Sequence, residues 1–337
     1  MNMKHENYDL VEQIFVPHTA VENAISRIDQ CYKATESSSE PICIALIGPT
    51  RSGKSRALEY IAKKHPITRL DDGLRVPIVS VRTPSNPTTK GLAEVMLRAI
   101  GDPNPGKGSE TNMTNRLITL LAAAETRMIM IDEFQHFYDK RSQKVMHHVA
   151  DWLKLVVDDS HVALVVSGLP SCQAVLNQNE QLAGRFMSPI QMPRFDWIVP
   201  DLREEFIGII GCFQEGLAHF DMPQLNNDDM AFRFYCATGG LIGYVAKILR
   251  QAVWNAIDAN RNVISLEDLS TAHKMSVYVD EKSKDLPLAF NREFSSQPNE
   301  ALLQRVNAIG TASPEVFLKK EIRTRSLLMS AGQVLHK

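Results

Sequence analysis

The sequence predicts an α/β fold, a parallel β-sheet flanked by helices, followed by a small all-α region. Two observations predict this class. Between residues 42 and 168, four apolar runs typical of buried strands alternate with segments of helical periodicity. Beyond about residue 200 the strand signal disappears, and the segments with a clear pattern are helical.

The strands are expected where apolar residues run without interruption. These runs cover residues 42–48, 76–82, 128–132 and 161–168. Between them, apolar residues recur at spacings of three and four, which predicts helices. These helices cover residues 53–64, 92–100, 115–124 and 142–158. Strands that alternate with helices in this way imply parallel strands joined by crossovers.

Shifts in composition divide the chain into four units. We expect an N-terminal helical segment over residues 1–40, an α/β domain over 41–200, a helical lid domain over 201–283 and a C-terminal tail or accessory segment over 284–337. In the lid domain, helices are expected over residues 201–220, 228–237, 242–259 and 266–276.

Composition limits the classes of function. Of the 337 residues, 44% are hydrophobic and 23% are charged, which is ordinary for a soluble globular protein. The net charge of -2 gives no global sign of nucleic-acid binding, although a local basic stripe can lie on a neutral protein. No apolar run approaches the roughly 20 residues that span a bilayer, and the N-terminus lacks the apolar stretch of a signal peptide. We therefore expect a cytoplasmic protein with no membrane partner.

A phosphate-binding loop (P-loop) follows the first expected strand. Residues 48–55, GPTRSGKS, match the pattern G-x-x-x-x-G-K-[ST] in full. In such a loop, backbone N–H groups and the next helix N-terminus bind phosphate oxygens, the lysine reaches the β- and γ-phosphates, and the serine binds Mg²⁺. We expect ATP binding by these residues and the following arginine: Gly48, Pro49, Thr50, Arg51, Ser52, Gly53, Lys54, Ser55 and Arg56.

The third expected strand ends in two acidic residues, Asp132 and Glu133. Asp132 should lie beside the P-loop, where it can hold Mg²⁺ together with Ser55. Glu133 is then placed to activate the attacking water as a general base. At the end of the fourth strand, Ser167 is expected to contact the γ-phosphate or that water. The alternative is a hydroxyl that satisfies local backbone groups.

Further residues suggest an assembly on nucleic acid. Arg185, in the stretch QLAGRF, is the candidate for an arginine finger acting on a neighbouring subunit; Arg194 and Arg203 compete with it, and a surface salt bridge is the alternative. Hydroxyl and basic side chains after the second and third expected strands suit contacts to a phosphate backbone, unless they form only a solvated charged face. These candidates for DNA contact are Thr88, Thr89, Lys90, Lys140, Arg141 and Lys144.

Five stretches, taken in order, resemble the TniB/TnsC family of AAA+ ATPases that regulate DNA transposition. They are GPTRSGKS, VRTPSNPTTKGLAEVMLRAIGDP, MIMIDEFQHF, VVSGLP and QLAGRF. The resemblance covers roughly residues 10–260. Its most family-like features are the DE-x-QH stretch at residues 132–136 and the proline-threonine loop after the second strand.

The resemblance implies an AAA+ α/β domain with a helical lid, ATP and Mg²⁺ as ligands, and a homo-oligomeric ring or filament on double-stranded DNA. It implies partners of the TniQ targeting type and the TnsB transposase type, with a TnsA-type endonuclease as a further candidate. ATP hydrolysis would control disassembly. By the same resemblance, Lys54 and Ser55 match the Walker A pair, Asp132 and Glu133 match Walker B, and Arg185 matches the arginine finger.

The lid departs from the AAA+ pattern. Many members carry a nucleotide-contacting arginine there, called sensor 2, but the stretch TGGLIGYVAKILR has Tyr244 where a basic residue is expected. Lys247 and Arg250 are the remaining candidates to reach the nucleotide. We expect slow ATP turnover as a result.

Two other functions compete with transposition regulation. A replication initiator or helicase loader would carry a winged-helix domain after the lid, and residues 281–337 look too short and too poor in strands for one. A signalling ATPase would act as a nucleotide-controlled scaffold without DNA. The islands LAFNREF and KKEIRTRS in the C-terminal segment are candidates for recruiting the transposase, with a packed accessory helix as the alternative.

Overall fold

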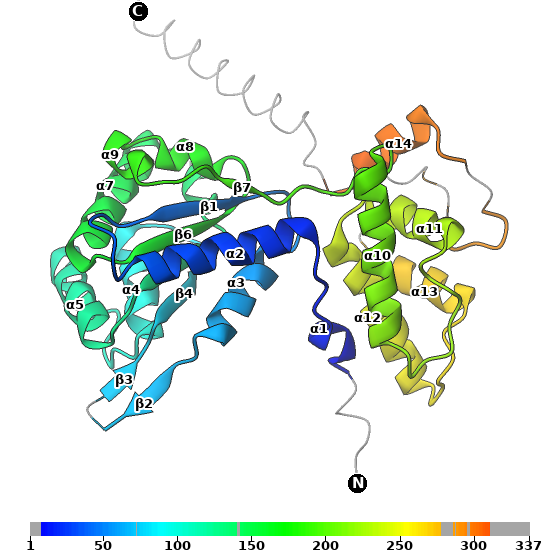
Figure 1. The fold of residues 1–337 in the computed structure, drawn as a ribbon, viewed down its shortest axis with the longest axis horizontal. Coiled ribbons are helices and arrows are strands. Elements are labelled where there is room, and N and C mark those ends of the chain that lie inside the picture. Colours follow the sequence, from blue (N-terminus) through cyan, green and yellow to red (C-terminus); the bar gives the residue numbers. More distant parts are fainter. Residues whose placement is uncertain are drawn as a thin grey trace, which may run out of the picture.

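The computed structural model describes residues 8–71, 73–139, 142–277, 286, 288–294 and 297–310. A β-sheet covered by helices lies on one side of the molecule, and a region of helices lies on the other (Figure 1). The chain crosses between the two after the last strand of the sheet, and the N-terminal segment also connects them. Within this part of the chain, no helix is long and apolar enough to cross a membrane.

The main sheet has five parallel strands in the order β4-β5-β6-β1-β7. Its strands are β1 (Cys43–Ile47), β4 (Ile78–Arg82), β5 (Met128–Asp132), β6 (Ala163–Gly168) and β7 (Ile190–Gln191). The first four of these are the predicted strands, displaced by at most two residues at either end. Because β6 lies between β1 and β5, the carboxyl ends of these three strands are neighbours. The predicted α/β class is confirmed.

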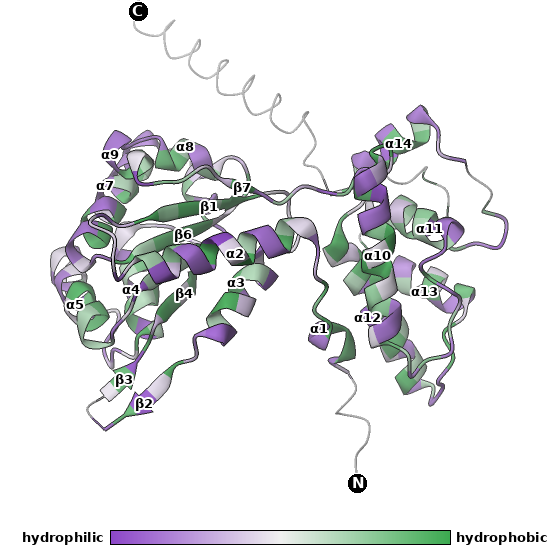
Figure 2. Cartoon of the chain, in the orientation of Figure 1, coloured by the Kyte–Doolittle hydropathy of each residue, from purple (hydrophilic) through white to green (hydrophobic). Residues whose placement is uncertain are grey.

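Helices cover both faces of the sheet, because the strand residues are apolar on both sides. Ile44 and Leu46 of β1 pack with α2 (Thr19–Ala34) and α3 (Lys54–Lys64). Ala45 and Ile47 belong to the core on the opposite face. That face is covered by α4 (Thr89–Ala99), α5 (Glu110–Ala123), α7 (Gln143–Ser160) and α8 (Cys172–Leu176). Figure 2 shows the hydrophobic strands between helices of mixed hydropathy.

Several short elements escape prediction from the sequence. An antiparallel hairpin of β2 (Thr68–Leu70) and β3 (Gly73–Arg75) projects from the sheet region. The residues of this hairpin are mostly exposed. A half-buried strand is recognised by alternating apolar and polar residues, and a strand that buries neither face has no need of that pattern. The other short elements are α1 (Leu10–Gln13), α6 (His136–Asp139) and α9 (Glu180–Gly184).

The helical region has its own core, which is rich in aromatic side chains. It contains the four predicted lid helices and one helix from the segment expected to be a tail. These are α10 (Pro200–Gly216), α11 (Asp228–Thr238), α12 (Ile242–Asp258), α13 (Leu266–Ser276) and α14 (Glu300–Asn307). The buried guanidinium of Arg233 donates hydrogen bonds to the carbonyl oxygens of Ala289, Asn291 and Phe294.

The island LAFNREF therefore packs into this helical core. Phe290 is 2% exposed and Phe294 is 9% exposed, so neither ring is available on the surface to recruit a partner. The burial of both rings favours the packed accessory segment, and recruitment of the transposase by this island stays a prediction. The island KKEIRTRS lies outside the described residues.

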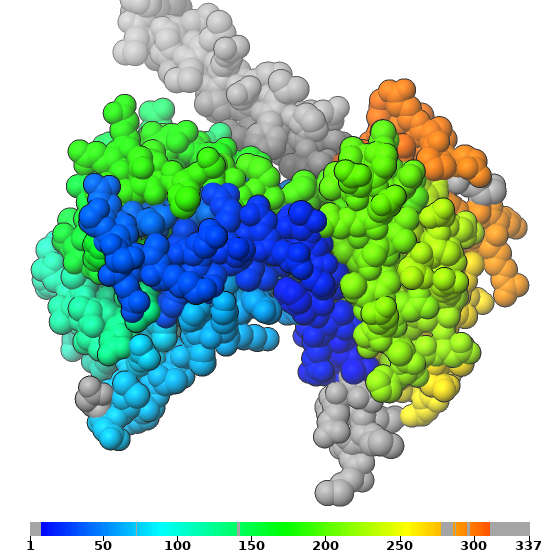
Figure 3. Space-filling model, viewed as in Figure 1, coloured from blue at the N-terminus to red at the C-terminus, as the bar shows by residue number. Residues whose placement is uncertain are grey.

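The N-terminal segment contacts both regions. Val11 of α1 belongs to the core of the helical region, whereas Val21 and Ile28 of α2 pack against the sheet. In the space-filling view, this segment runs from the sheet region to the helical region above a hollow between them (Figure 3). The P-loop and the first turn of α3 lie close to this crossing.

Candidate nucleotide-binding site

The P-loop connects β1 to α3 and is shaped by close backbone approaches. At Gly48 a Cβ atom would lie 2.1 Å from the carbonyl oxygen of Met192, so only glycine fits there. Gly53 has a φ of +97°, a left-handed conformation that glycine adopts without strain. Gly53 is also the N-cap of α3 and has no side chain to cap it, which leaves backbone N–H groups of the first turn free for a ligand.

The side chain of Lys54 folds back onto the P-loop. Its ammonium donates hydrogen bonds to the carbonyl oxygens of Gly48 (2.9 Å) and Pro49 (2.6 Å). Burial lowers the pKa of Lys54, and the charges of Glu133 and Asp132 oppose that effect. Because the lysine has carbonyls but no carboxylate within ion-pairing distance among the described residues, a phosphate would supply the negative charge that it lacks.

The two expected Mg²⁺ ligands lie together. The Ser55 hydroxyl donates a hydrogen bond of 2.6 Å to Oδ2 of Asp132, although the two residues are 77 positions apart. Asp132 ends β5, and its other oxygen accepts from the N–H of Glu133 at 2.9 Å. A hydroxyl and a carboxylate at this distance fit Mg²⁺, which is bound by few protein oxygens and by substrate phosphates.

Ser167 is the third predicted site residue that reaches this edge of the sheet. It lies near the end of β6, between the strands that carry the P-loop and Asp132. Its side chain is fully buried, and its hydroxyl has no hydrogen-bond partner in the described structure. A buried hydroxyl without a partner costs free energy, so the local backbone does not satisfy this group. That observation favours the expected ligand contact over the alternative.

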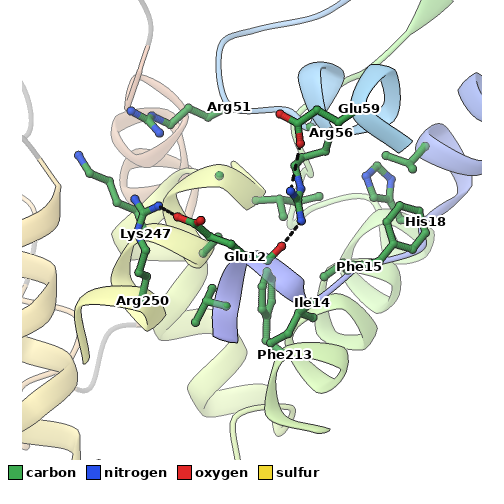
Figure 4. Close-up of a pocket in the computed structure, with 17 residues that line it drawn as sticks. Glu12, Ile14, Phe15, His18, Arg51, Arg56, Glu59, Phe213, Lys247 and Arg250 are labelled. Atoms are coloured by element: carbon green, nitrogen blue, oxygen red, sulfur yellow. Dashed lines mark hydrogen bonds and ion pairs between the residues drawn. The ribbon is translucent and has the colours of Figure 1, made fainter. Parts of the chain in front are cut away.

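A cavity of about 480 Å³ lies beside the P-loop, between the N-terminal segment and the helical region (Figure 4). Its walls come from the P-loop and α3, from α10 and α12, and from the residues that join α1 to α2. The N-terminal lining residues are Val11, Glu12, Ile14, Phe15, Val16, His18 and Val21. A largely apolar cavity of this size is suited to a nucleobase and its sugar. This wall could not be predicted from the sequence, because the N-terminal residues share no motif with the P-loop.

Cations gather where the helical region meets the P-loop. The guanidinium carbon of Arg51 lies 5.1 Å from the ring centroid of Tyr244, and the backbone N–H of Gly243 donates to the Arg51 carbonyl at 2.9 Å. Tyr244, at the position where a sensor 2 residue was expected, therefore covers an arginine of the P-loop. The next residue on this face of α12, one turn later, is Lys247.

Lys247 and Arg250 differ in their partners. Arg250 forms an ion pair of 2.8 Å with Glu12 of α1. Lys247 lines the cavity, and in the described part of the chain no carboxylate pairs with it. Desolvation lowers the pKa of Lys247, and the charges of Arg51 and Arg250 lower it further. An anion bound near Arg51 would relieve this repulsion.

Comparison with models of protein families shows which family the chain belongs to. A family model described as "Bacterial TniB protein" matches residues 8–197, more than half of the sequence. The chain belongs to the TniB family. The resemblance inferred from the sequence motifs is thereby confirmed. Among curated proteins, no sequence match was found.

Solved structures with a similar fold include a Cdc6 protein and two ORC proteins. Cdc6p from Pyrobaculum aerophilum is 14% identical, with a TM-score of 0.59 over 81% of this chain and 72% of that one. The ORC2 protein of Aeropyrum pernix in ADPNP–ADP complexes is 11% identical, with the same TM-score and coverage. The ORC1 protein of Aeropyrum pernix in complex with DNA is 16% identical, with a TM-score of 0.57 over 82% and 71% of the two chains. These likenesses confirm the predicted AAA+ fold.

In this TniB-family chain, Arg185 lies at the opposite end of β1 from the P-loop. Its backbone carbonyl accepts from the N–H of Cys43, the first residue of β1, at 3.0 Å. Its guanidinium pairs with Asp158 of α7 at 2.7 Å. Arg185 is therefore remote from the P-loop of its own subunit, and its action on a neighbour stays a prediction. The competitor Arg194 donates to the carbonyls of Asn307 and Ile309 and so holds the end of α14.

The predicted DNA-contacting residues have different environments. Thr88 caps α4 by accepting from the N–H of Gly91 at 2.9 Å. Thr89 is 2% exposed, and its hydroxyl donates a hydrogen bond to the carboxylate of Glu110. This hydroxyl is therefore buried and already paired, and is not on the surface where DNA would bind. Lys90 and Lys144 are exposed in the first turns of α4 and α7. Lys140 and Arg141 lie outside the described residues.

One carboxylate joins residues near the N-terminal ends of α4, α5 and α7. Glu110 of α5 accepts from Thr89 of α4, and its other oxygen lies 2.9 Å from Nε2 of His148 of α7. Lys90 adjoins Thr89 in sequence, and Lys144 is one helical turn before His148. The two exposed lysines therefore lie near the N-terminal ends of α4 and α7, two helices that Glu110 of α5 joins.

Proposed function

We propose that this chain binds ATP with Mg²⁺ at Gly48–Ser55 and hydrolyses it slowly. The hydrogen bond between Ser55 and Asp132 is the observation that carries the proposal, because it joins the P-loop to a strand-end carboxylate in the arrangement that phosphoryl transfer needs. Mg²⁺, when bound there, would neutralise charge on the β- and γ-phosphates. The cavity beside Arg51 and Gly53 would hold the base and sugar.

The chain's own side chains then take distinct roles. Lys54 exchanges its loop carbonyls for phosphate oxygens and neutralises part of their charge. Glu133 accepts a proton from the attacking water as the water oxygen bonds to the γ-phosphorus and the bond from that phosphorus to the β–γ bridging oxygen breaks, so that ADP leaves. The Ser167 hydroxyl donates a hydrogen bond to the γ-phosphate or positions the attacking water. Turnover is slow because no sensor 2 arginine stands at Tyr244 and because Arg185 can complete only the site of a neighbouring subunit.

We further propose that the protein oligomerises, as a ring or filament, on double-stranded target DNA. Lys90 and Lys144 would contact phosphates together with the N-termini of α4 and α7, and Thr88 would orient the first of these. In this role the protein would link a TniQ-type targeting protein to a TnsB-type transposase, and hydrolysis would govern disassembly. Membership of the TniB family and the likeness to an ORC1 protein in complex with DNA support this proposal.

Assembly is tested by electron microscopy and sedimentation with duplex DNA and a slowly hydrolysed ATP analogue. We expect ordered oligomers that require both ligands and that are absent in Lys54→Ala. Monomers under all conditions would refute the assembly.

The DNA surface is tested by the salt dependence of duplex binding. Lys90→Glu and Lys144→Glu should each weaken binding and reduce the slope of log affinity against log salt by about one, because each lysine would neutralise one phosphate. Lys274→Glu, an exposed lysine on α13, is the matched control. Equal binding by all variants would place the DNA surface elsewhere, and no salt-sensitive duplex binding by the wild type would favour the signalling scaffold that acts without DNA.

A further inference from the structure

Gln135 is a buried amide beside the proposed general base, and it takes no direct part in the proposed hydrolysis. It lies between β5 and α6, two residues after Glu133, and is 3% exposed. Its Nε2 donates to Oε2 of Glu133. Its Oε1 accepts a hydrogen bond of 3.2 Å from the backbone N–H of Leu169, just beyond β6.

The orientation of this amide follows from its partners. A backbone N–H can only donate, so the oxygen of Gln135 must face Leu169 and the NH₂ group must face Glu133. This NH₂ group donates to one oxygen of the Glu133 carboxylate and so fixes the direction of that oxygen. The neighbouring residue makes room for the arrangement, because a Cβ atom at Gly168 would lie 2.4 Å from Oε1 of Gln135.

The backbone around Glu133 is already tied to both strands. The N–H of Glu133 donates to Asp132 at 2.9 Å, and the N–H of Phe134 donates to the Ser167 carbonyl at 2.9 Å. Glu133 has a φ of +57°, which is unusual for a residue with a side chain. Among the described residues, the only hydrogen bond to the Glu133 carboxylate comes from Gln135. The direction of that carboxylate therefore depends on Gln135.

We propose that Gln135 is a positioning residue that couples Glu133 to the end of β6, where Ser167 lies. The inference rests on the proposed ATPase function. One carboxylate oxygen of Glu133 is held by the amide, which leaves Oε1 to accept the proton of the attacking water. A shift of the Ser167–Leu169 segment on binding nucleotide would move the amide and, with it, the base.

Three variants of the full chain separate positioning from loss of structure. Gln135→Leu removes the amide but keeps a buried side chain of similar size. Gly168→Ala keeps Gln135 and displaces its oxygen. Gln135→Glu places a second carboxylate against Glu133, while Asp132 and Lys54, the other charged groups facing Glu133, remain. The control is Gln178→Ala, because the Gln178 amide bonds only to the local Ala174 carbonyl.

The steady-state experiment measures kcat and KM for ATP from pH 5 to 9, with nucleotide affinity from a fluorescent analogue. We expect Gln135→Leu and Gly168→Ala to lower kcat about tenfold, with KM and affinity within twofold of wild type. In Gln135→Glu the second carboxylate should repel the carboxylate of Glu133 and also lower kcat. A wild-type kcat in Gln135→Leu would overturn the proposal, as would parallel losses of kcat and affinity.

A second readout does not depend on hydrolysis. Hydrogen exchange of the Leu169 amide should be faster in Gln135→Leu than in wild type, and unchanged in Glu133→Gln and in Gln178→Ala. Unchanged exchange in Gln135→Leu would refute the coupling. If the wild type hydrolyses no ATP, the proposed ATPase function fails instead. If Glu133→Gln matches the wild-type rate, Glu133 is not the general base. In both cases the exchange result still decides whether Gln135 joins the two segments.

Discussion

The carboxyl edge of the sheet and the helical region both face the P-loop, but they contribute to it in different ways. At the sheet edge, Ser55, Asp132 and Ser167 come together because parallel strands end side by side. In the helical region, Tyr244 and Lys247 reach the P-loop only because α12 packs against Arg51. The first arrangement follows a recurring motif and the second is particular to this chain. The difference teaches that the groups proposed for the chemistry lie at the strand ends, whereas the helical region adds contacts that are particular to this chain.

The largest effect is expected at the sheet edge, from Glu133→Gln. The amide cannot accept the proton of the attacking water, so the rate of ATP hydrolysis should fall about 10²- to 10⁴-fold. Nucleotide affinity should change less than twofold, because in the proposed site Lys54 and the loop bind the phosphates. Phosphate release at saturating ATP and analogue binding measure the two quantities. A rate near that of wild type would place the base outside the sheet edge.

The next effect tests whether residues 288–294 belong to the core of the helical region. Arg233→Met leaves the carbonyls of Ala289, Asn291 and Phe294 without their donor, so the free energy of unfolding should fall by about 2–4 kcal/mol. Urea unfolding measures it. Arg261→Met removes an exposed ion pair with Asp268 in the same region and should cost less. Equal losses in the two variants would contradict the anchoring role of Arg233.

A smaller effect concerns the attachment of α2 to α3. Burial alone would raise the pKa of Asp29, but hydrogen bonds and charge from Lys33, Lys64 and His65 outweigh it and lower the pKa to about 2. A lowered pKa means that the stabilisation is present above about pH 4 and is lost as the pH falls towards 2. Asp29→Asn should lose about 1–2 kcal/mol near pH 6 and show a weaker acid dependence. Urea unfolding between pH 3 and 6 measures the free energy of unfolding of both proteins. If it depends on pH in the same way in Asp29→Asn as in wild type, the ion pairs of Asp29 are not the cause of the acid dependence.

The smallest effect would sharpen the role of the helical region. Lys247→Met should weaken ATP binding about 5- to 10-fold, because the lysine is a cation beside the P-loop without a carboxylate partner among the described residues. Titration with a fluorescent ATP analogue measures the affinity. Lys274→Met on α13 serves as the control. If both variants bind ATP as wild type does, the helical region contributes only Tyr244 and packing to the site.

Much of the fold follows from patterns along the sequence. The runs that became β1, β4, β5 and β6 are apolar because both faces of the sheet are covered, and that signal is unambiguous. The two-residue strand β7 and the exposed hairpin are too short or too polar to show a period. Residues 288–309 look like a tail because no motif marks them, yet Phe290 and Val306 are buried by contacts with α11 and its neighbours.

The candidate site likewise contains residues that the sequence predicts and residues that only the structure reveals. Gly48–Ser55, Asp132 and Glu133 are recognisable because motif spacing and strand ends determine their positions. Gln135 is visible in the sequence only as part of the DE-x-QH stretch, and its proposed function emerges from the contact with Leu169. Thr89 looks like a surface hydroxyl in the sequence, but Glu110 takes its hydrogen bond from a helix about twenty residues away. The placement of Arg185 next to a neighbour's nucleotide stays a prediction.

By itself, the sequence determined the order of strands and helices, the P-loop, the acidic strand end and the family to which the chain belongs. These features depend on neighbouring residues and on the rule that parallel strands align their carboxyl ends. The tertiary structure decided which distant groups face the P-loop: the N-terminal wall of the cavity, Tyr244 over Arg51, Lys247 in the cavity wall and an Arg250 held by Glu12. The physical reason is that pairing between side chains as far apart in sequence as Glu12 and Arg250, 238 residues, is set by the packing of whole helices, which local patterns do not encode.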